Sequence, residues 1–215
     1  MNRTAVAVIK RYLLLLAGLA VMAFGVAFSI KASLGTSPIS SVPYVVSLFS
    51  PLTVGTATII MHCVFILLQI LILRRKYHLI QLMQLPVAFF FGYLTDFGVW
   101  AVQSIDCHTY WQQWLICLIG ILLVAAGVSL EVKAGVVVLA GEGVVLAICK
   151  VLPIKFGYMK VLFDVTLVVI ACILSLVFTG HLQGVREGTV AAAIMVGLIA
   201  KQLGKILSRW KLEEI

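Results

Sequence analysis

The chain contains long runs of apolar residues, and their length constrains the fold more than any other feature. Six runs approach or exceed the roughly 20 residues that an α-helix needs to cross about 30 Å of hydrocarbon. Of the 215 residues, 63% are apolar and 11% are charged, whereas a soluble domain is about 45–50% apolar and about 25% charged. The sequence therefore predicts an all-α, polytopic membrane protein. The predicted spans are 12–32, 53–73, 79–102, 112–132, 157–178 and 188–207.

Two shorter apolar segments lie between these spans. Residues 36–50 and 138–152 are each 15 residues long and are interrupted by Gly, Pro or Ser. A helix of that length falls short of a full crossing. We interpret both as re-entrant or half-membrane segments.

The two halves of the sequence resemble each other when one half is shifted by 102 residues. Apolar matches are common in any membrane protein, but this register also pairs Lys with Lys, Pro with Pro and Gly with Gly. It predicts one membrane domain built from two repeats of three spans each, residues 1–103 and 104–215. The most informative matches are Gly18 with Gly120, Gly25 with Gly127, Lys31 with Lys133, Pro51 with Pro153 and Gly55 with Gly157.

Basic residues near the span ends give the chain an orientation, because Lys and Arg favour the cytoplasmic side. The loop 103–111 carries Asp106 and no Lys or Arg, as expected of an outer loop. Both termini are then cytoplasmic, and the two repeats have opposite orientations. The net charge of +8 does not indicate a nucleic-acid partner, because no soluble basic segment with interleaved aromatic residues exists. The orienting residues are Arg3, Lys10, Arg11, Arg74, Arg75, Lys76, Lys201, Lys205, Arg209 and Lys211.

Asp164 is the carboxylate placed deepest in a predicted span. Ionisable residues at this depth are costly and normally face a cavity or a partner. Lys160 precedes Asp164 by four residues, so a helix places both side chains on one face, where they can neutralise each other. The pair is a candidate for substrate or ion binding, and a purely structural ion pair is the alternative.

Glu142 is the strongest candidate for a binding residue. It lies in the second short segment between Gly141 and Gly143, whose missing side chains allow irregular backbone and close approach of a ligand. The 102-residue shift relates Glu142 to Ser40 and Asp164 to His62. Inverted symmetry would bring these four positions towards the centre, although a buried histidine is more often a packed residue than a ligand.

Five further charged residues are weaker candidates. Lys31 and Lys133 close the first span of each repeat, where a lysine also complements the helix C-terminus or snorkels to the interface. Arg186 and Glu187 precede the last span, where Glu187 suits a helix N-terminus. Asp96, late in the third span, faces either a cavity or the outer interface.

Catalytic and metal-binding signatures are not found in the sequence. It has no H-E-x-x-H, G-x-S-x-G, Walker or Rossmann motif, and its four histidines do not cluster. We therefore predict no enzyme activity, metal or cofactor. Without an ATP-binding domain, active transport would use an ion gradient, and Glu142 and Asp164 are the natural proton or cation carriers, since a carboxyl group removed from water takes up a proton more readily.

The chain resembles the bacterial YczE/YyaS/YitT family of integral membrane proteins, in particular its YczE-like branch. Many members carry Trp-Asp where this chain has Ile39 and Ser40, so a role for that acidic residue is not transferred. The resemblance covers nearly the whole chain and implies a multi-pass protein of the bacterial cytoplasmic membrane with a transport role and no assigned substrate. The matching residues are Gly25, Val26, Ala27, Ala32, Leu34, Gly35, Pro38, Gly55, Thr56, Gly141, Glu142, Gly143, Gly188 and Thr189.

These observations predict a secondary transporter that moves a small polar or charged solute by alternating access. The alternative is an accessory protein that assembles with another membrane complex and needs packed faces rather than a cavity. An intramembrane enzyme would need a second catalytic group facing Glu142, and only His62 is available. The predicted partners are the lipid bilayer and a solute or ion, and a homo-oligomer is left open.

Overall fold

The computed structural model describes residues 3–207, with side chains from residue 8 onwards, and every regular element in that range is helical. Arg209 and Lys211, which helped to orient the chain, lie outside the described residues. Two short 3-10 helices, Arg74–Lys76 and Leu79–Met83, separate α3 from α4. The α-helices are α1 (Arg3–Lys31), α2 (Pro38–Phe49), α3 (Val54–Leu73), α4 (Gln84–Ala101), α5 (Tyr110–Ala134), α6 (Ala140–Val151), α7 (Phe156–Thr179) and α8 (Glu187–Leu207).

Six of these helices are long and apolar enough to cross a membrane, which confirms the predicted multi-pass membrane protein. Apart from the starts of α1 and α4, their bounds agree with the predicted spans to within two residues, and α1 begins at Arg3 rather than at residue 12. The third span begins differently, because residues 79–83 form a 3-10 helix and α4 begins only at Gln84. Pro86 then falls in the first turn of α4, where its missing N–H breaks no helical hydrogen bond.

The two short helices, α2 and α6, occupy the two short apolar segments. Pro38 is the first residue of α2, and Ser37 precedes it in extended conformation. In α6 the helix is regular from Ala140 onwards, so Glu142 lies in its first turn. The irregular backbone that Gly141 and Gly143 were expected to permit is therefore not present.

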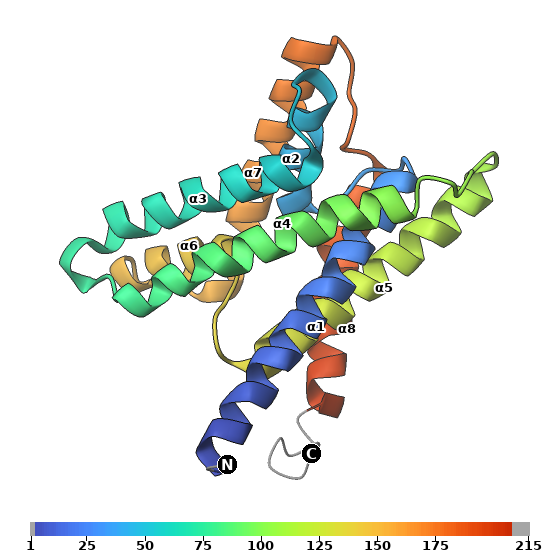
Figure 1. Cartoon of the computed structure of the whole chain (residues 1–215). Coiled ribbons are helices and arrows are strands. Elements are labelled where there is room, and N and C mark those ends of the chain that lie inside the picture. Colours follow the sequence, from blue (N-terminus) through green and yellow to red (C-terminus); the bar gives the residue numbers. More distant parts are fainter. Residues whose placement is uncertain (1–2, 208–215) are drawn as a thin grey trace.

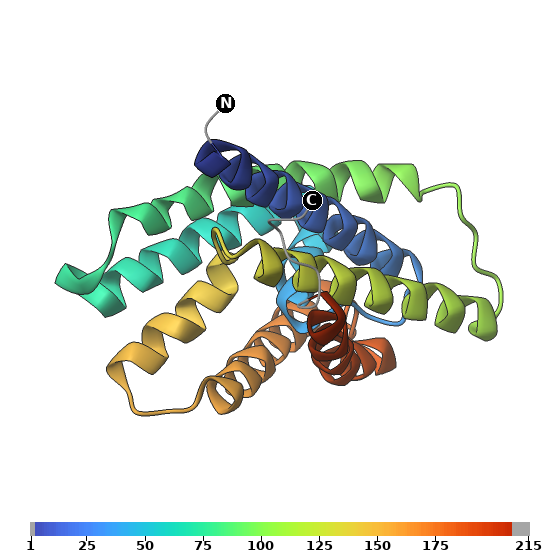
Figure 2. The ribbon, with the colours of Figure 1, turned by 90° about the horizontal axis from the view of Figure 1, so that it is seen from below.

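Helices α1 and α5 lie against each other and form the most extensive helix pair (Figures 1 and 2). Four glycines bring the two backbones together. A Cβ atom on Gly25 would lie 2.6 Å from the Val124 amide nitrogen, and one on Gly127 would lie 2.6 Å from the Gly18 carbonyl oxygen. Small residues allow this close approach of membrane helices.

The remaining helices pack either on this pair or on one another (Figure 2). Helix α4 contacts α1 and α3, and α8 contacts α5, while α2 packs on α7 and α3 packs on α6. Helices α7 and α8 do not pack closely against each other in the described part of the chain. They are also the two spans with the smallest buried share.

Candidate functional site

A cavity of about 300 Å³ lies where the helices converge, and all eight α-helices contribute to its lining. Its walls are mainly apolar, with side chains such as Met22, Val26 and Phe91. Both short helices reach the cavity with their N-terminal ends. Its polar and charged lining residues are Ser37, Ser40, Thr58, His62, Glu131, Glu142, Lys160 and Asp164.

The structure brings together five of the residues predicted from sequence. Ser40 of α2, His62 of α3, Glu142 of α6, and Lys160 and Asp164 of α7 all border the one cavity. They come from two pairs of consecutive helices, α2–α3 and α6–α7, which are far apart in sequence. Their proximity makes a shared site physically feasible, and their role in binding stays a prediction.

The two charged residues of α7 form an ion pair. Lys160 Nζ lies 2.6 Å from Asp164 Oδ1 across one helical turn. Both side chains are partly covered, and the ammonium group lies 6.0 Å from the ring centroid of Phe163. The pair brings no net charge into the cavity, because each group neutralises the other.

Glu142 borders the cavity from the first turn of α6 and is half-buried. Its side chain makes no hydrogen bond to any other residue in the range 3–207. The positive end of the helix dipole favours a carboxylate at this position. The Glu142 carboxyl group therefore keeps hydrogen-bonding capacity that no described residue uses.

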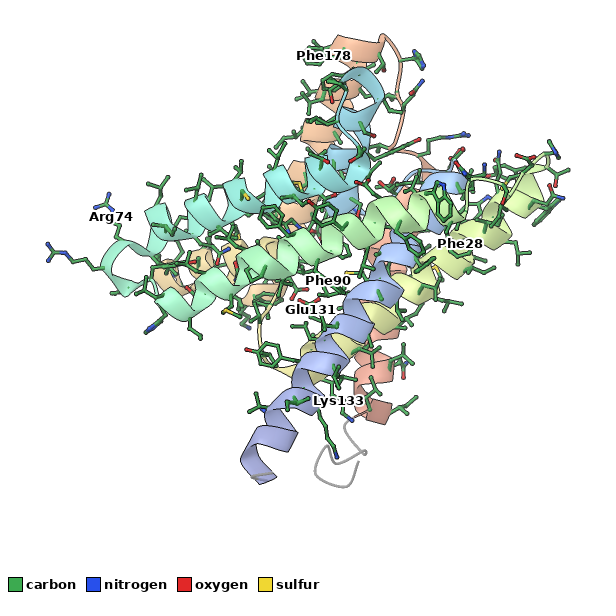
Figure 3. All side chains as sticks on the ribbon, viewed as in Figure 1. Phe28, Arg74, Phe90, Glu131, Lys133 and Phe178 are labelled. Atoms are coloured by element: carbon green, nitrogen blue, oxygen red, sulfur yellow. The ribbon has the colours of Figure 1, made fainter. Side chains whose placement is uncertain are left out.

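Glu131 is a second cavity carboxylate, which the sequence reasoning missed. Only 2% of the residue is exposed, and its Oε1 accepts a hydrogen bond of 2.7 Å from the amide of Leu139, the residue that precedes α6. Figure 3 shows Glu131 close to the centre of the molecule. Glu131 lies in the last turn of a predicted span, two residues before Lys133. A charged residue at this position is expected at the membrane interface rather than in the interior. The available signal was that the neighbours on its own helix face, Val128 and Ala134, are apolar.

His62 is buried in the wall of the same cavity, with 2% of the residue exposed. Its ring stacks on Phe65 and Phe91, with centroid distances of 6.2 and 6.1 Å. Its Nδ1 atom has no hydrogen-bond partner among the described residues. Packing against the aromatic rings agrees with the conservative interpretation, but the unpaired nitrogen is not explained by packing.

Two of the three candidate lysines, Lys31 and Lys133, lie outside the cavity lining and connect helix ends. Lys31 Nζ donates a hydrogen bond of 2.8 Å to the Gln103 carbonyl and lies 3.9 Å from Asp106 Oδ1. Lys133 Nζ donates one of 2.5 Å to the carbonyl of Leu207, at the end of α8. Figure 3 shows the Lys133 side chain pointing away from the centre of the molecule, where Glu131 lies. These contacts agree with the alternative of helix-end anchoring, and a binding role for either lysine stays a prediction.

Gly141 and Gly143 also serve packing rather than ligand approach. A Cβ atom on Gly141 would lie 2.3 Å from Cδ1 of Ile39, and one on Gly143 would lie 2.6 Å from Oε1 of Gln69. The space beside each glycine is thus filled by a neighbouring helix. Both glycines let α6 approach α2 and α3 closely.

The three secondary candidates are engaged away from the cavity. Asp96 fastens α4 to the start of α3, since its Oδ2 accepts a hydrogen bond of 2.6 Å from Thr53 Oγ1 and its Oδ1 accepts one of 2.7 Å from the Gly55 amide. Arg186 Nε lies 3.3 Å from Glu187 Oε2, and Glu187 is the first residue of α8. The expected helix-start role of Glu187 agrees with this arrangement.

The protein belongs to the class of all-α, multi-pass membrane proteins, and ionisable side chains line its internal cavity. The sequence profile of a family described as a family of unknown function, DUF6198, matches residues 9–205, and the chain belongs to this family. A search of curated proteins and a search of solved structures each returned no match.

Proposed function

We propose that the protein is a secondary transporter that moves a small polar or charged solute across the membrane by alternating access. The observation that carries this proposal is the cavity, which collects Glu131, Glu142, Lys160 and Asp164 at the convergence of six membrane-spanning helices and two short ones. Charged side chains inside membrane proteins commonly mark solute or ion pathways.

Correspondence between the two halves supports inverted repeats, each with a short half-membrane helix. Adding 102 to the bounds of α2, 38 and 49, gives 140 and 151, which are the bounds of α6. In transporters with inverted repeats, the site lies between the repeats, and broken helices direct their ends at the substrate. The short helices reach the cavity in this manner.

The helix contacts support the same proposal. The shift of 102 residues exchanges α2 with α6 and α3 with α7, and the α2–α7 contact has its counterpart in the α3–α6 contact. Lys31 and Lys133 are also related by the shift. Each donates to a backbone carbonyl at the end of the last helix of its own repeat.

One pair of helices breaks this correspondence and indicates a conformational state. Helices α3 and α4 are tightly packed, and a Cβ atom on Gly55 would lie 2.1 Å from the Gly92 carbonyl. Their counterparts α7 and α8 are apart, and a Cβ atom on Gly157 would meet nothing within 4 Å. With the proposed orientation, α3 and α4 close the outer side, and the gap between α7 and α8 leaves the cavity open inwards.

The accessory-protein alternative receives less support. It needs packed faces and no cavity, whereas the charged residues here border about 300 Å³ of space. The resemblance to the YczE-like branch supports a bacterial cytoplasmic membrane location with both termini inside. This resemblance does not identify a substrate.

Transport assays with reconstituted protein test this function. Proteoliposomes containing a pH-sensitive dye would be screened with small cations, anions and zwitterions for solute-driven proton movement. We expect a signal that Glu142→Gln and Asp164→Asn each reduce at least about tenfold, because each removes a cavity charge. Glu187→Gln is the matched control, since that carboxylate lies outside the cavity lining. Full activity in both cavity variants, with correct folding, would overturn the proposal.

A further inference from the structure

The charges around the cavity do not balance, and this imbalance defines what the cavity can hold. Its ionisable lining residues are Glu131, Glu142, Asp164, Lys160 and His62. Lys160 is already paired with Asp164 at 2.6 Å. Lys160 also acts electrostatically on Glu142, so three carboxyl groups in the lining share this one ammonium group. Two carboxylates in an apolar setting attract a cation or a proton.

The walls favour an organic cation over a metal ion. A bare Mg²⁺ or Ca²⁺ ion requires about six or more oxygen ligands, and the described residues contain no group of three or more His, Cys, Asp or Glu side chains placed to hold a metal. An organic ammonium brings its own apolar surface to walls such as Val124, Val128 and Val196. Phe91 adds an aromatic side chain to the same lining.

Two polar groups in the cavity, one half-exposed and one buried, are open to an N–H donor. The Glu142 carboxylate accepts no hydrogen bond from residues 3–207, and the buried His62 Nδ1 has no partner in the same range. A neutral imidazole nitrogen without a proton is an acceptor. A protonated amine supplies the donors that both groups lack.

Exposed lining residues on α7 and α8 show that the gap that opens the cavity inwards also runs along the sides of these two helices. Val161 of α7 is 63% exposed and yet borders the cavity. Ala193 and Gly197 of α8 are also exposed and also border it. Because α7 and α8 are two of the spanning helices, a molecule dissolved in the lipid can enter sideways between them.

We propose that this cavity binds a protonated amine with a compact apolar body, which enters from the lipid between α7 and α8 and is held by Glu142 and Glu131. This proposal rests on the proposed transport function and names its substrate class. A cavity of about 150 Å³ accommodates benzene. The space of about 300 Å³ thus has room for an aromatic ring with a short aminoalkyl chain.

Binding of two probes of similar shape and opposite charge tests the substrate class. Purified protein in nanodiscs of phosphatidylcholine and phosphatidylglycerol would be titrated with 2-phenylethylamine and with 3-phenylpropionate. We expect the amine to bind and the carboxylate not to bind. Glu142→Gln should weaken amine binding at least about tenfold, because the ammonium loses its counter-charge. Glu187→Gln, which neutralises a carboxylate outside the lining, should leave it unchanged.

Access from the lipid is tested with two glycines of α8. A Cβ atom on either Gly197 or Gly204 would meet nothing within 4 Å, so both sites accept a larger side chain without a clash. Only Gly197 borders the cavity. We expect Gly197→Leu to slow amine association several-fold and Gly204→Leu to leave the rate unchanged. Equal association rates in both variants would contradict entry between α7 and α8.

The outcomes separate this proposal from the transport function. Preferred binding of 3-phenylpropionate, or amine binding that survives both Glu142→Gln and Glu131→Gln, would overturn the substrate class even if proteoliposomes transport another solute. Amine binding without transport would keep the site and remove the transporter function. Competition by added phosphatidylethanolamine would identify a lipid amine as the occupant, and its absence would identify a free amine.

Discussion

At the scale of single residues, the buried carboxylate of Glu131 has the most consequential environment. It lies at the end of α5 and accepts a hydrogen bond from the Leu139 amide at the start of α6. One side chain thus joins a spanning helix to a short helix and also borders the cavity. A buried backbone N–H without a partner costs about 1–3 kcal/mol, so this hydrogen bond contributes to the position of α6.

Two substitutions of Glu131 separate its hydrogen bond from its charge. Glu131→Gln keeps an oxygen acceptor for the Leu139 amide, whereas Glu131→Ala removes it. We expect the Ala variant to be less stable than the Gln variant by about 1–3 kcal/mol, measured as a lower midpoint of thermal unfolding in detergent. The same two substitutions at the exposed Glu187 should differ by less than about 0.5 kcal/mol. Equal midpoints for the two Glu131 variants would show that the hydrogen bond is not structural.

At the scale of helices, Asp96 distinguishes the closed pair α3–α4 from the open pair α7–α8. Its carboxylate accepts hydrogen bonds from both Thr53 and the Gly55 amide, at the point where α3 and α4 approach most closely. The repeat-related position in α8 is Leu198, which has no carboxylate. The carboxylate that joins α3 to α4 in the first repeat therefore has no counterpart between α7 and α8 in the second repeat.

Removing this fastening should open the outer side. In a background without native cysteines, Ile59→Cys places a thiol on α3 beside Gly92 of α4. We expect Asp96→Ala to raise the rate at which an impermeant maleimide labels this thiol by roughly tenfold, the effect of about 1.4 kcal/mol. Asp106→Ala, in the loop before α5, is the control and should not change the rate. A labelling rate that Asp96→Ala leaves unaltered would contradict the fastening role.

At the scale of the whole molecule, basic residues gather at one end of the helix bundle. Figure 3 shows Arg74 at the far end of α3, and Figure 1 shows the loop between α4 and α5 at the opposite end. Lys150 and Lys155 flank the short connection between α6 and α7. This distribution agrees with the proposed cytoplasmic location of the Arg74 end.

Labelling of single cysteines tests the orientation of the whole molecule. Ser104→Cys, in the loop between α4 and α5, and Arg75→Cys, after α3, both replace exposed residues. In intact cells, we expect an impermeant maleimide to label position 104 and not position 75. Inside-out vesicles should give the reverse pattern and serve as the control. Labelling of position 75 in intact cells would invert the proposed topology.

The sequence alone was sufficient for the features that depend on local residues. Span positions follow from the length of apolar runs, and the contact between Lys160 and Asp164 follows from helical spacing. The bounds of the short helices α2 and α6 also fall within the segments predicted from composition. These properties need only the neighbouring residues in the chain.

The features that could not be predicted from the sequence depend on contacts between residues that are far apart in the chain. The cavity position of Glu131 depends on how the end of α5 meets the start of α6, and the packing role of Gly143 depends on Gln69 of α3. The gap between α7 and α8 depends on all the helices around it. The long apolar runs determined which segments are membrane helices, because transfer into lipid depends on each segment by itself. Only tertiary packing decided which charged residues face a common cavity, because this depends on the rotation and separation of helices relative to one another.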